Sequence, residues 1–127
     1  VAVIHDQRAD RAGNVLIEGV LGVQKEAVLA SKRSVVTVEE IVDDLGPRSL
    51  NAVILPHWTI QHVVAVPGGA FPSYAQGYYA RNNAFYKKWD DIARERESFL
   101  AWMKQNVLEK GQEAFAQYAR KARAAAE

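Results

Sequence analysis

The chain contains no cysteine, which excludes disulfide bonds, thiol nucleophiles and thiolate metal sites. It also has no apolar run near the roughly 18 residues that a membrane-spanning helix needs, so we expect no membrane insertion. Neither sign of charge dominates: 16 Lys and Arg stand against 15 Asp and Glu, for a net charge of +1. That balance offers no basic face for a polyanion, so we expect no nucleic-acid partner.

The start of the chain, Val1–Ile4, carries neither a methionine nor a basic leader segment. We therefore expect a cytoplasmic location and a fragment of a larger protein. The composition, 49% hydrophobic and 24% charged over 127 residues, is that of an ordinary globular chain with enough residues for one domain.

Short apolar runs separated by polar segments predict an α/β arrangement. Val1–Ile4 is a continuous apolar run, as in a strand that is buried on both faces, and Val35–Val38 is predicted to be a second buried strand. Between them the segment 24–32 has helical spacing. Further strands are predicted at Val15–Ile17, Val53–Leu55 and Val63–Val66. This order of strand, helix and strand is typical of a βαβ unit in an α/β sheet.

After Gly77 the pattern changes to a helical one. Apolar residues recur at steps of three and four from Phe85 to Val107, which predicts one long amphipathic helix. Gly111 ends it, and Phe115 and Tyr118 begin a second helical stripe. We expect a single domain over residues 1–127, with an α/β portion at 1–76 and a helical extension at 77–127. The aromatic residues near Phe85 favour a core or an interface over a nucleic-acid platform.

The polar segment His5–Asn14 is predicted to leave the first strand as a turn, because Asp10, Gly13 and Asn14 favour turn conformations. Ligands of open α/β sheets bind beyond the carboxyl ends of the strands. Gln7, Asp10 and Asn14 are therefore candidates to contact a ligand or to brace a neighbouring loop. The residues alone favour a plain turn.

A pair of glycines, Gly68 and Gly69, follows the last predicted strand. Adjacent glycines allow a positive φ or a close approach of the backbone to another group. Two interpretations remain open: a tight turn, or a loop that lies against a nucleotide-like ligand or a partner subunit.

Other candidate sites are weaker. Glu39, Glu40, Asp43 and Asp44 favour a charged helix start, although the alternation after Val38 also allows Glu39 to face the sheet edge. The three histidines lack the helical spacing of metal ligands, so we predict no metal site. No serine lies in a G-x-S-x-G context, and no catalytic residue is assigned on this chain.

Several segments, in this order, carry a family likeness. They are His5–Asn14, Gly22–Ala30, Val36–Val42, Val66–Ala70 and Arg81–Tyr86. Together they resemble the C-terminal half of the α (A) subunit of a class I coenzyme A transferase of the glutaconate/3-oxoacid type. The likeness runs from Val1 to about Leu108. One departure is Phe71, where relatives commonly carry a histidine before the proline.

The resemblance implies an open, mainly parallel sheet with flanking helices, shared with sugar-phosphate isomerases, followed by a C-terminal helical segment. It implies a β subunit in an α2β2 heterotetramer, whose glutamate attacks an acyl-CoA and then carries CoA as a glutamyl-CoA thioester to a second carboxylic acid. Coenzyme A thioester is then a substrate, and no cofactor is bound covalently. Gln7, Asp10, Asn14, Gly68 and Gly69 are the candidate contacts to substrate or CoA.

Other functions stay open at this point. A CoA-thioester hydrolase or ring-opening enzyme on the same scaffold would share the same α-subunit pattern. A non-catalytic interaction domain would account for the aromatic segment and the amphipathic helix. A sugar-phosphate-binding domain would fit the superfamily that the resemblance implies.

Overall fold

The computed structural model describes residues 1–124, apart from the side chains of Gln112, Ala119, Arg120, Ala122, Arg123 and Ala124. The chain forms two compact units, which are treated separately below. The sheet unit comprises Val1–Gly69 and Ala75–Tyr78, and the helical unit comprises Ala70–Tyr74 and the residues from Tyr79 onward. Residues 125–127 of the predicted helical extension lie outside the described residues, and the single-domain organisation stays a prediction.

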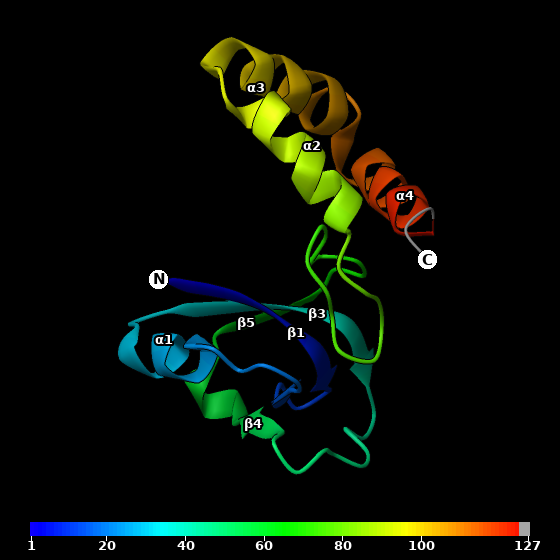
Figure 1. Ribbon diagram of the computed structural model, residues 1–127. Coiled ribbons are helices and arrows are strands. Elements are labelled where there is room, and N and C mark those ends of the chain that lie inside the picture. The colour runs from blue at the N-terminus through cyan, green and yellow to red at the C-terminus, as the bar shows by residue number, and fades with distance from the viewer. Residues whose placement is uncertain (125–127) are drawn as a thin grey trace. The chain divides into compact units, whose positions relative to one another are not determined.

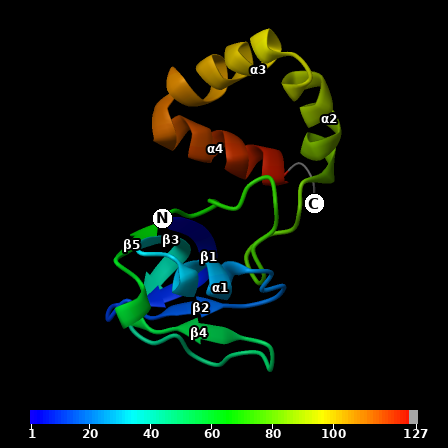
Figure 2. The ribbon, with the colours of Figure 1, turned by 90° about the vertical axis from the view of Figure 1, so that its left-hand side faces the viewer.

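The sheet unit contains a five-stranded sheet in the order β4-β2-β1-β3-β5 (Figures 1 and 2). The strands are β1 Ala2–Asp10, β2 Val15–Ile17, β3 Ser34–Val42, β4 Val53–Leu55 and β5 His62–Ala65. β1, β3 and β5 run parallel, whereas β2 and β4 add an antiparallel edge. The predicted open, mainly parallel α/β sheet is confirmed.

Two strands are longer than the sequence predicted. β1 continues to Asp10, so the predicted turn from His5 onward is wrong for its first half. β3 continues to Val42, where a charged helix start was expected. The reason is the parallel ladder between them, which keeps one register from the Ala2↔Ser34 pair to the Asp10↔Val42 pair. Backbone pairing along this ladder outweighs the local preference of the polar residues.

A small apolar core holds the sheet unit together. The helix α1, Gln24–Ala30, lies beside the sheet (Figure 1). It buries Val28 in this core. β2 is buried at all three of its residues, as expected for a strand between two others with both faces covered. The cluster consists of Ala2, Ala9, Val15, Ile17, Val28, Val36, Val38 and Leu55.

The helical unit contains α2 Asn83–Ala93, α3 Arg96–Met103, a π-helical segment η2 Lys104–Leu108, and α4 Gly111–Ala124 (Figure 2). The predicted single helix from Phe85 to Val107 is therefore wrong: Glu95 is extended, with φ −113° and ψ 139°. α3 packs on α2, with the ring of Trp89 5.3 Å from that of Trp102. Both helices bury their apolar faces in one aromatic cluster. The apolar residues therefore recur every three or four positions on both sides of the break at Glu95.

The start of α2 is fixed by Asn82. Its side chain accepts a hydrogen bond from the backbone N–H of Phe85 at 2.8 Å, a standard N-cap. Phe71 lies in the same cluster, with its ring 5.0 Å from that of Phe85. The aromatic segment thus contributes Phe85 and Trp89 to a core, as predicted, while Tyr74 and Tyr86 remain exposed. Within residues 1–124, no helix is both long and apolar enough to cross a bilayer.

Candidate functional site

The predicted site residues all lie in the sheet unit, but in separate places. Asp10 ends β1 at the level of Val42, and Asn14 closes the turn that follows. Gly68 and Gly69 follow β5 and lie beside the middle of β3, since the N–H of Val66 donates to the carbonyl of Val38. The structure therefore forms two groups along β3 rather than one cluster.

The turn after β1 is held by its own polar side chains. The carboxylate of Asp10 accepts hydrogen bonds from the backbone N–H of Asn14 at 2.9 Å and from its Nδ2 at 2.7 Å. Burial alone would raise the pKa of Asp10, but these hydrogen bonds, with those of the Ala12 and Gly13 N–H groups, lower it below the usual range. The Oδ1 of Asn14 in turn accepts from the N–H of His57 at 2.9 Å. The turn is thereby joined to the segment after β4.

A cavity of about 420 Å³ opens beside this turn. Of the five predicted site residues, Asp10 lines it, and a carboxylate kept ionised at neutral pH gives it a polar wall. The other lining residues are Arg11, Ala12, Gly13, Ile41, His57, Ile60, Gln61 and Val63.

We expect Asn14→Ala to destabilise the full-length protein by about 1–3 kcal/mol, because it removes the bonds to Asp10 and His57. The pKa of Asp10 should rise toward its ordinary value, since its strongest hydrogen-bond donor is lost. Urea unfolding and an NMR titration of the Asp10 carboxyl measure both effects. The exposed Asn51→Ala variant is the control, and an unshifted Asp10 in Asn14→Ala would contradict the account.

Gln7 braces the backbone from within β1. Its side chain is nearly fully buried, and its Oε1 accepts from the N–H of Glu18 at 2.8 Å. The carboxylate of Glu18 is held by Arg8 at 3.5 Å and by the N–H of Ser49 at 3.2 Å. Gln7 therefore fixes the exit of β2.

The two glycines after β5 are needed for different reasons. Gly68 has a φ of +83°, a conformation that strains other residues, and its N–H donates to Glu39 Oε2 at 2.7 Å. At Gly69 a Cβ atom would lie 2.5 Å from Cε1 of His5, so no side chain fits there. Both properties expected of the glycine pair, positive φ and close approach, are realised, and the group approached is a side chain of the same chain.

His5 and Glu39 form a largely buried pair beside this loop. Nε2 of His5 lies 2.8 Å from Glu39 Oε1, and Nδ1 lies 2.8 Å from Oγ1 of Thr37. Glu39 is only 6% exposed. The pair was not predicted from the sequence, because it depends on the β1–β3 register, which sets His5 opposite Thr37. The alternation after Val38 was the one local signal for Glu39.

Asp6 is a second unpredicted carboxyl. It is 2% exposed, and its Oδ2 has no hydrogen-bond partner among the described residues. Burial raises the pKa of Asp6 to about 7, and the neighbouring His5 opposes that rise. Buried polar groups are normally hydrogen-bonded, so this one marks an unusual environment.

His5 lies between the hydroxyl of Thr37 and the carboxylate of Glu39, but that hydroxyl donates to the carbonyl of Ile4, so its proton is not directed at His5. Both carboxylate oxygens of Glu39 accept hydrogen bonds, one from His5 and one from Gly68. Nor, within residues 1–124, do three His, Asp or Glu side chains gather closely enough to hold a metal ion. The polar side chains described here instead hold the loops that follow the strands of the open α/β sheet.

The model of the coenzyme A transferase family matches residues 1–66 of this chain. The chain is 60% identical over 107 residues to the A subunit of the 3-oxoadipate CoA-transferase of Pseudomonas knackmussii, covering 84% of this chain and 38% of that protein. It is 34% identical over 110 residues to the A subunit of the glutaconate CoA-transferase of Acidaminococcus fermentans, covering 86% and 34%.

Solved structures agree with these matches. The crystal structure of glutaconate coenzyme A-transferase from Acidaminococcus fermentans superposes with a TM-score of 0.78 at 29% identity, over 91% of this chain and 37% of that chain. A variant of the decarboxylase AibA/AibB superposes with a TM-score of 0.56 at 27% identity, over 80% and 38%.

The fold is that of an open α/β protein with glycine-containing and polar turns after its strands. The match to the family model and the 60% identity to a transferase subunit show that the chain belongs to the coenzyme A transferase family. The two transferase relatives that it matches by sequence are A subunits, as the sequence resemblance implied. The chain spans between a third and two fifths of the length of these relatives.

Proposed function

We propose that this chain is part of the A subunit of a heteromeric enzyme that moves CoA from an acyl-CoA to a short dicarboxylic acid such as 3-oxoadipate. The 60% identity to the A subunit of a 3-oxoadipate CoA-transferase, sustained over 107 residues, carries this proposal. The more distant glutaconate enzyme also takes its name from a short dicarboxylic acid, which supports the substrate class.

The reaction exchanges a thioester for a carboxylate and needs no external oxidant or reductant. A glutamate on the B subunit first attacks the acyl-CoA carbonyl and releases the CoA thiolate, which leaves a mixed anhydride. The thiolate attacks the glutamyl carbonyl, giving glutamyl-CoA and the free first acid. The second acid then reverses both steps and leaves as its CoA ester. The engagement of both Glu39 oxygens supports a nucleophile outside this chain.

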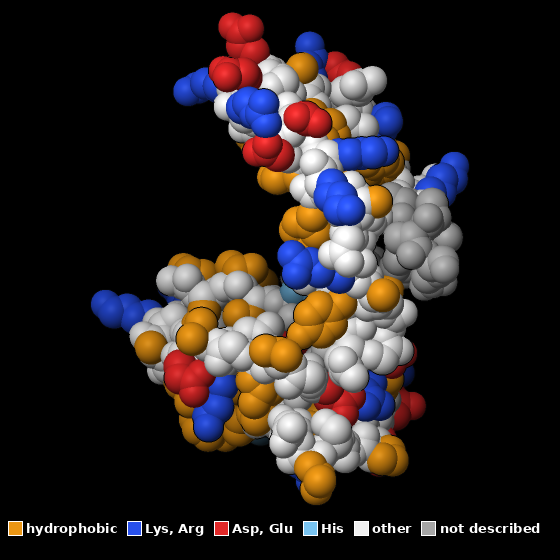
Figure 3. All heavy atoms as spheres, viewed as in Figure 1, with side chains coloured by type: hydrophobic (Ala, Val, Ile, Leu, Met, Phe, Trp, Pro, Cys, Tyr) orange, Lys and Arg blue, Asp and Glu red, His pale blue; other side chains and the backbone are white. Residues whose placement is uncertain are grey.

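In this proposal the present chain supplies scaffold, substrate contacts and subunit surface. Asp10 and Asn14 at the turn, Gln7 behind it, and Gly68 and Gly69 after β5 are the candidate contacts to substrate or CoA. The sheet unit exposes large apolar side chains that a partner would cover; Figure 3 shows hydrophobic side chains gathered on this unit. They include Val3, Val20, Val23 and Leu29. An α2β2 assembly is the arrangement that we propose.

The test is an assay of the full-length protein purified with its B subunit. Given a panel of acyl-CoA donors, we expect 3-oxoadipate to become its CoA ester, with no free CoA accumulating and no product when the B subunit is omitted. Release of free CoA that does not depend on an acceptor acid would instead indicate a thioester hydrolase. Turnover without the B subunit would contradict the proposal.

A second candidate reaction is decarboxylation, because 80% of the chain also superposes on a decarboxylase. The lower TM-score and the shorter coverage make this the weaker candidate. Measuring CO₂ release from the same acyl-CoA panel distinguishes the two reactions, since CoA transfer releases none.

A further inference from the structure

We propose that His5 and Glu39 are positioning residues, which hold the Gly68–Gly69 loop in the shape that receives the CoA thioester. The inference rests on the proposed function for its substrate and on the sheet unit for its geometry. No catalytic role is assigned to either side chain, since both act through the loop.

Two contacts hold the loop, one to each glycine. Glu39 Oε2 accepts the N–H of Gly68 at 2.7 Å, and the ring of His5 lies directly under Gly69. Both contacts come from one pair, because His5 Nε2 also lies 2.8 Å from Glu39 Oε1. We therefore expect a change at either side chain to disturb both glycines.

The hydrogen bonds of His5 fix the orientation of its ring. The hydroxyl of Thr37 donates to the carbonyl of Ile4 at 3.1 Å, and its oxygen lies 2.8 Å from Nδ1 of His5. Glu39 then accepts from Nε2. Because each ring nitrogen has a partner, the ring is held in one orientation.

A largely buried contact between a histidine and a carboxylate is weak support for stability, because the cost of desolvation offsets its attraction. Such pairs are instead well suited to fixing one geometry. The geometry fixed here is that of a loop leaving a parallel strand at its carboxyl end, where open α/β sheets bind ligands. Gly69 is exposed, so bare backbone faces the solvent there.

The engaged N–H groups show which part of the loop is left for a ligand. Gly68 donates to Glu39, and Gly69 donates to the carbonyl of Val66 at 2.9 Å. Neither N–H is therefore directed at a bound phosphate, so the loop contributes its shape and its side-chain-free surface. A substrate that packs on such a surface loses affinity when the loop shifts.

The experiment compares His5→Ala, Glu39→Gln and Gly69→Ala in the full-length assembly, with His62→Ala as the control. His62 is an exposed histidine on β5, outside the pair. Glu39→Gln keeps the shape of the side chain, and Gly69→Ala forces a Cβ against the His5 ring, so the loop is tested without deleting a buried side chain.

Two readouts are needed. Hydrogen exchange of the peptide covering residues 66–70 should accelerate about tenfold or more in the three variants and remain unchanged in His62→Ala. The KM for acyl-CoA should rise by a similar factor with kcat nearly constant, since the loop acts in binding. Combining His5→Ala with Gly69→Ala should add little to either single effect.

Unchanged exchange in all three variants would overturn the positioning role. Faster exchange with an unchanged KM would overturn the role in substrate binding. If the wild-type assembly transfers no CoA, the proposed function fails, and the exchange readout still decides whether the pair holds the loop.

Discussion

Asp6→Asn should raise the stability of the full-length protein at pH 8 and remove a large part of its pH dependence between pH 4 and pH 7. Asp6 is buried, and its pKa rises from 3.8 to about 7 in the folded state. Folding therefore favours the protonated carboxyl. Its contribution is fully present below pH 3.8 and is lost as the pH rises to about 7. At about 1.4 kcal/mol per pH unit, the loss is on the order of 4 kcal/mol.

Urea unfolding of wild type and variant at several pH values from 4 to 8 measures this effect. The exposed Glu26→Gln variant is the matched control, because Glu26 lies on the surface of α1 and should leave the profile unchanged. Equal profiles for wild type and Asp6→Asn would contradict the prediction.

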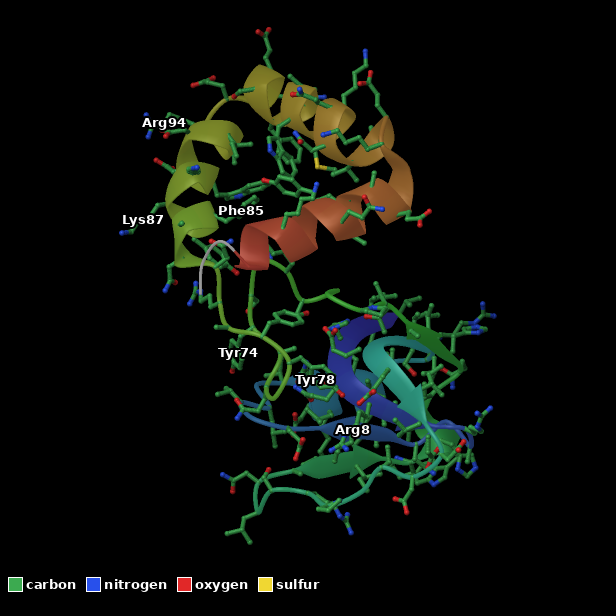
Figure 4. All side chains as sticks on the ribbon, turned by 90° about the vertical axis from the view of Figure 1, so that its right-hand side faces the viewer. Arg8, Tyr74, Tyr78, Phe85, Lys87 and Arg94 are labelled. Carbon is green, nitrogen blue, oxygen red and sulfur yellow. The ribbon has the colours of Figure 1, made fainter. Side chains whose placement is uncertain are left out.

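Phe85→Ala should destabilise the helical unit by about 3–5 kcal/mol, the cost of removing a buried aromatic ring. The ring of Phe85 lies 5.6 Å from that of Trp89 and 6.1 Å from that of Trp102. Figure 4 shows Lys87 and Arg94 pointing away from this cluster, so α2 presents one apolar and one charged face. The cavity of about 460 Å³ beside Phe85 would enlarge in the variant.

The fluorescence of Trp89 and Trp102 reports this unfolding when the exposed Trp58 is replaced by phenylalanine. Leu100→Ala, at a side chain that is 50% exposed, serves as the control. If residues 1–127 form a single domain, as the sequence predicts, the circular dichroism of the sheet unit should be lost in the same transition. A midpoint for Phe85→Ala equal to that of Leu100→Ala would contradict the assignment of Phe85 to the core.

The short strands could be predicted because each one is marked by a local sequence pattern. β2 and β4 coincide with their predicted ranges, since each is an isolated apolar run that needs no knowledge of its neighbours. The full lengths of β1 and β3 were not predictable in this way. Their last residues are polar, and only pairing with each other keeps them extended.

The break between α2 and α3 was also hidden from the sequence. No glycine or proline marks Glu95, and the apolar spacing continues through it. The break is a tertiary effect: the rings of Trp89 and Phe99 meet at 6.1 Å only when the chain folds back there. Propensity along one helix carries no information about that contact.

For the candidate site, the turns of the backbone could be predicted from the sequence, whereas the buried ionisable side chains could not. The Asp10–Asn14 turn and the glycine pair followed from turn chemistry. The His5–Glu39 contact did not, because it joins residues 34 positions apart through the strand register. Asp6 was missed because a lone carboxylate is expected at the surface rather than in a core.

The most direct test of the central claim is to locate the CoA-bearing carboxyl group in the assembled enzyme. The full-length A and B subunits are incubated with an acyl-CoA, treated with borohydride, which reduces a glutamyl thioester to an alcohol, and mapped by mass spectrometry. The account predicts one reduced glutamate on the B subunit, with the A subunit unmodified, Glu39 included. Modification of Glu39, or of any other residue of this chain, would contradict it.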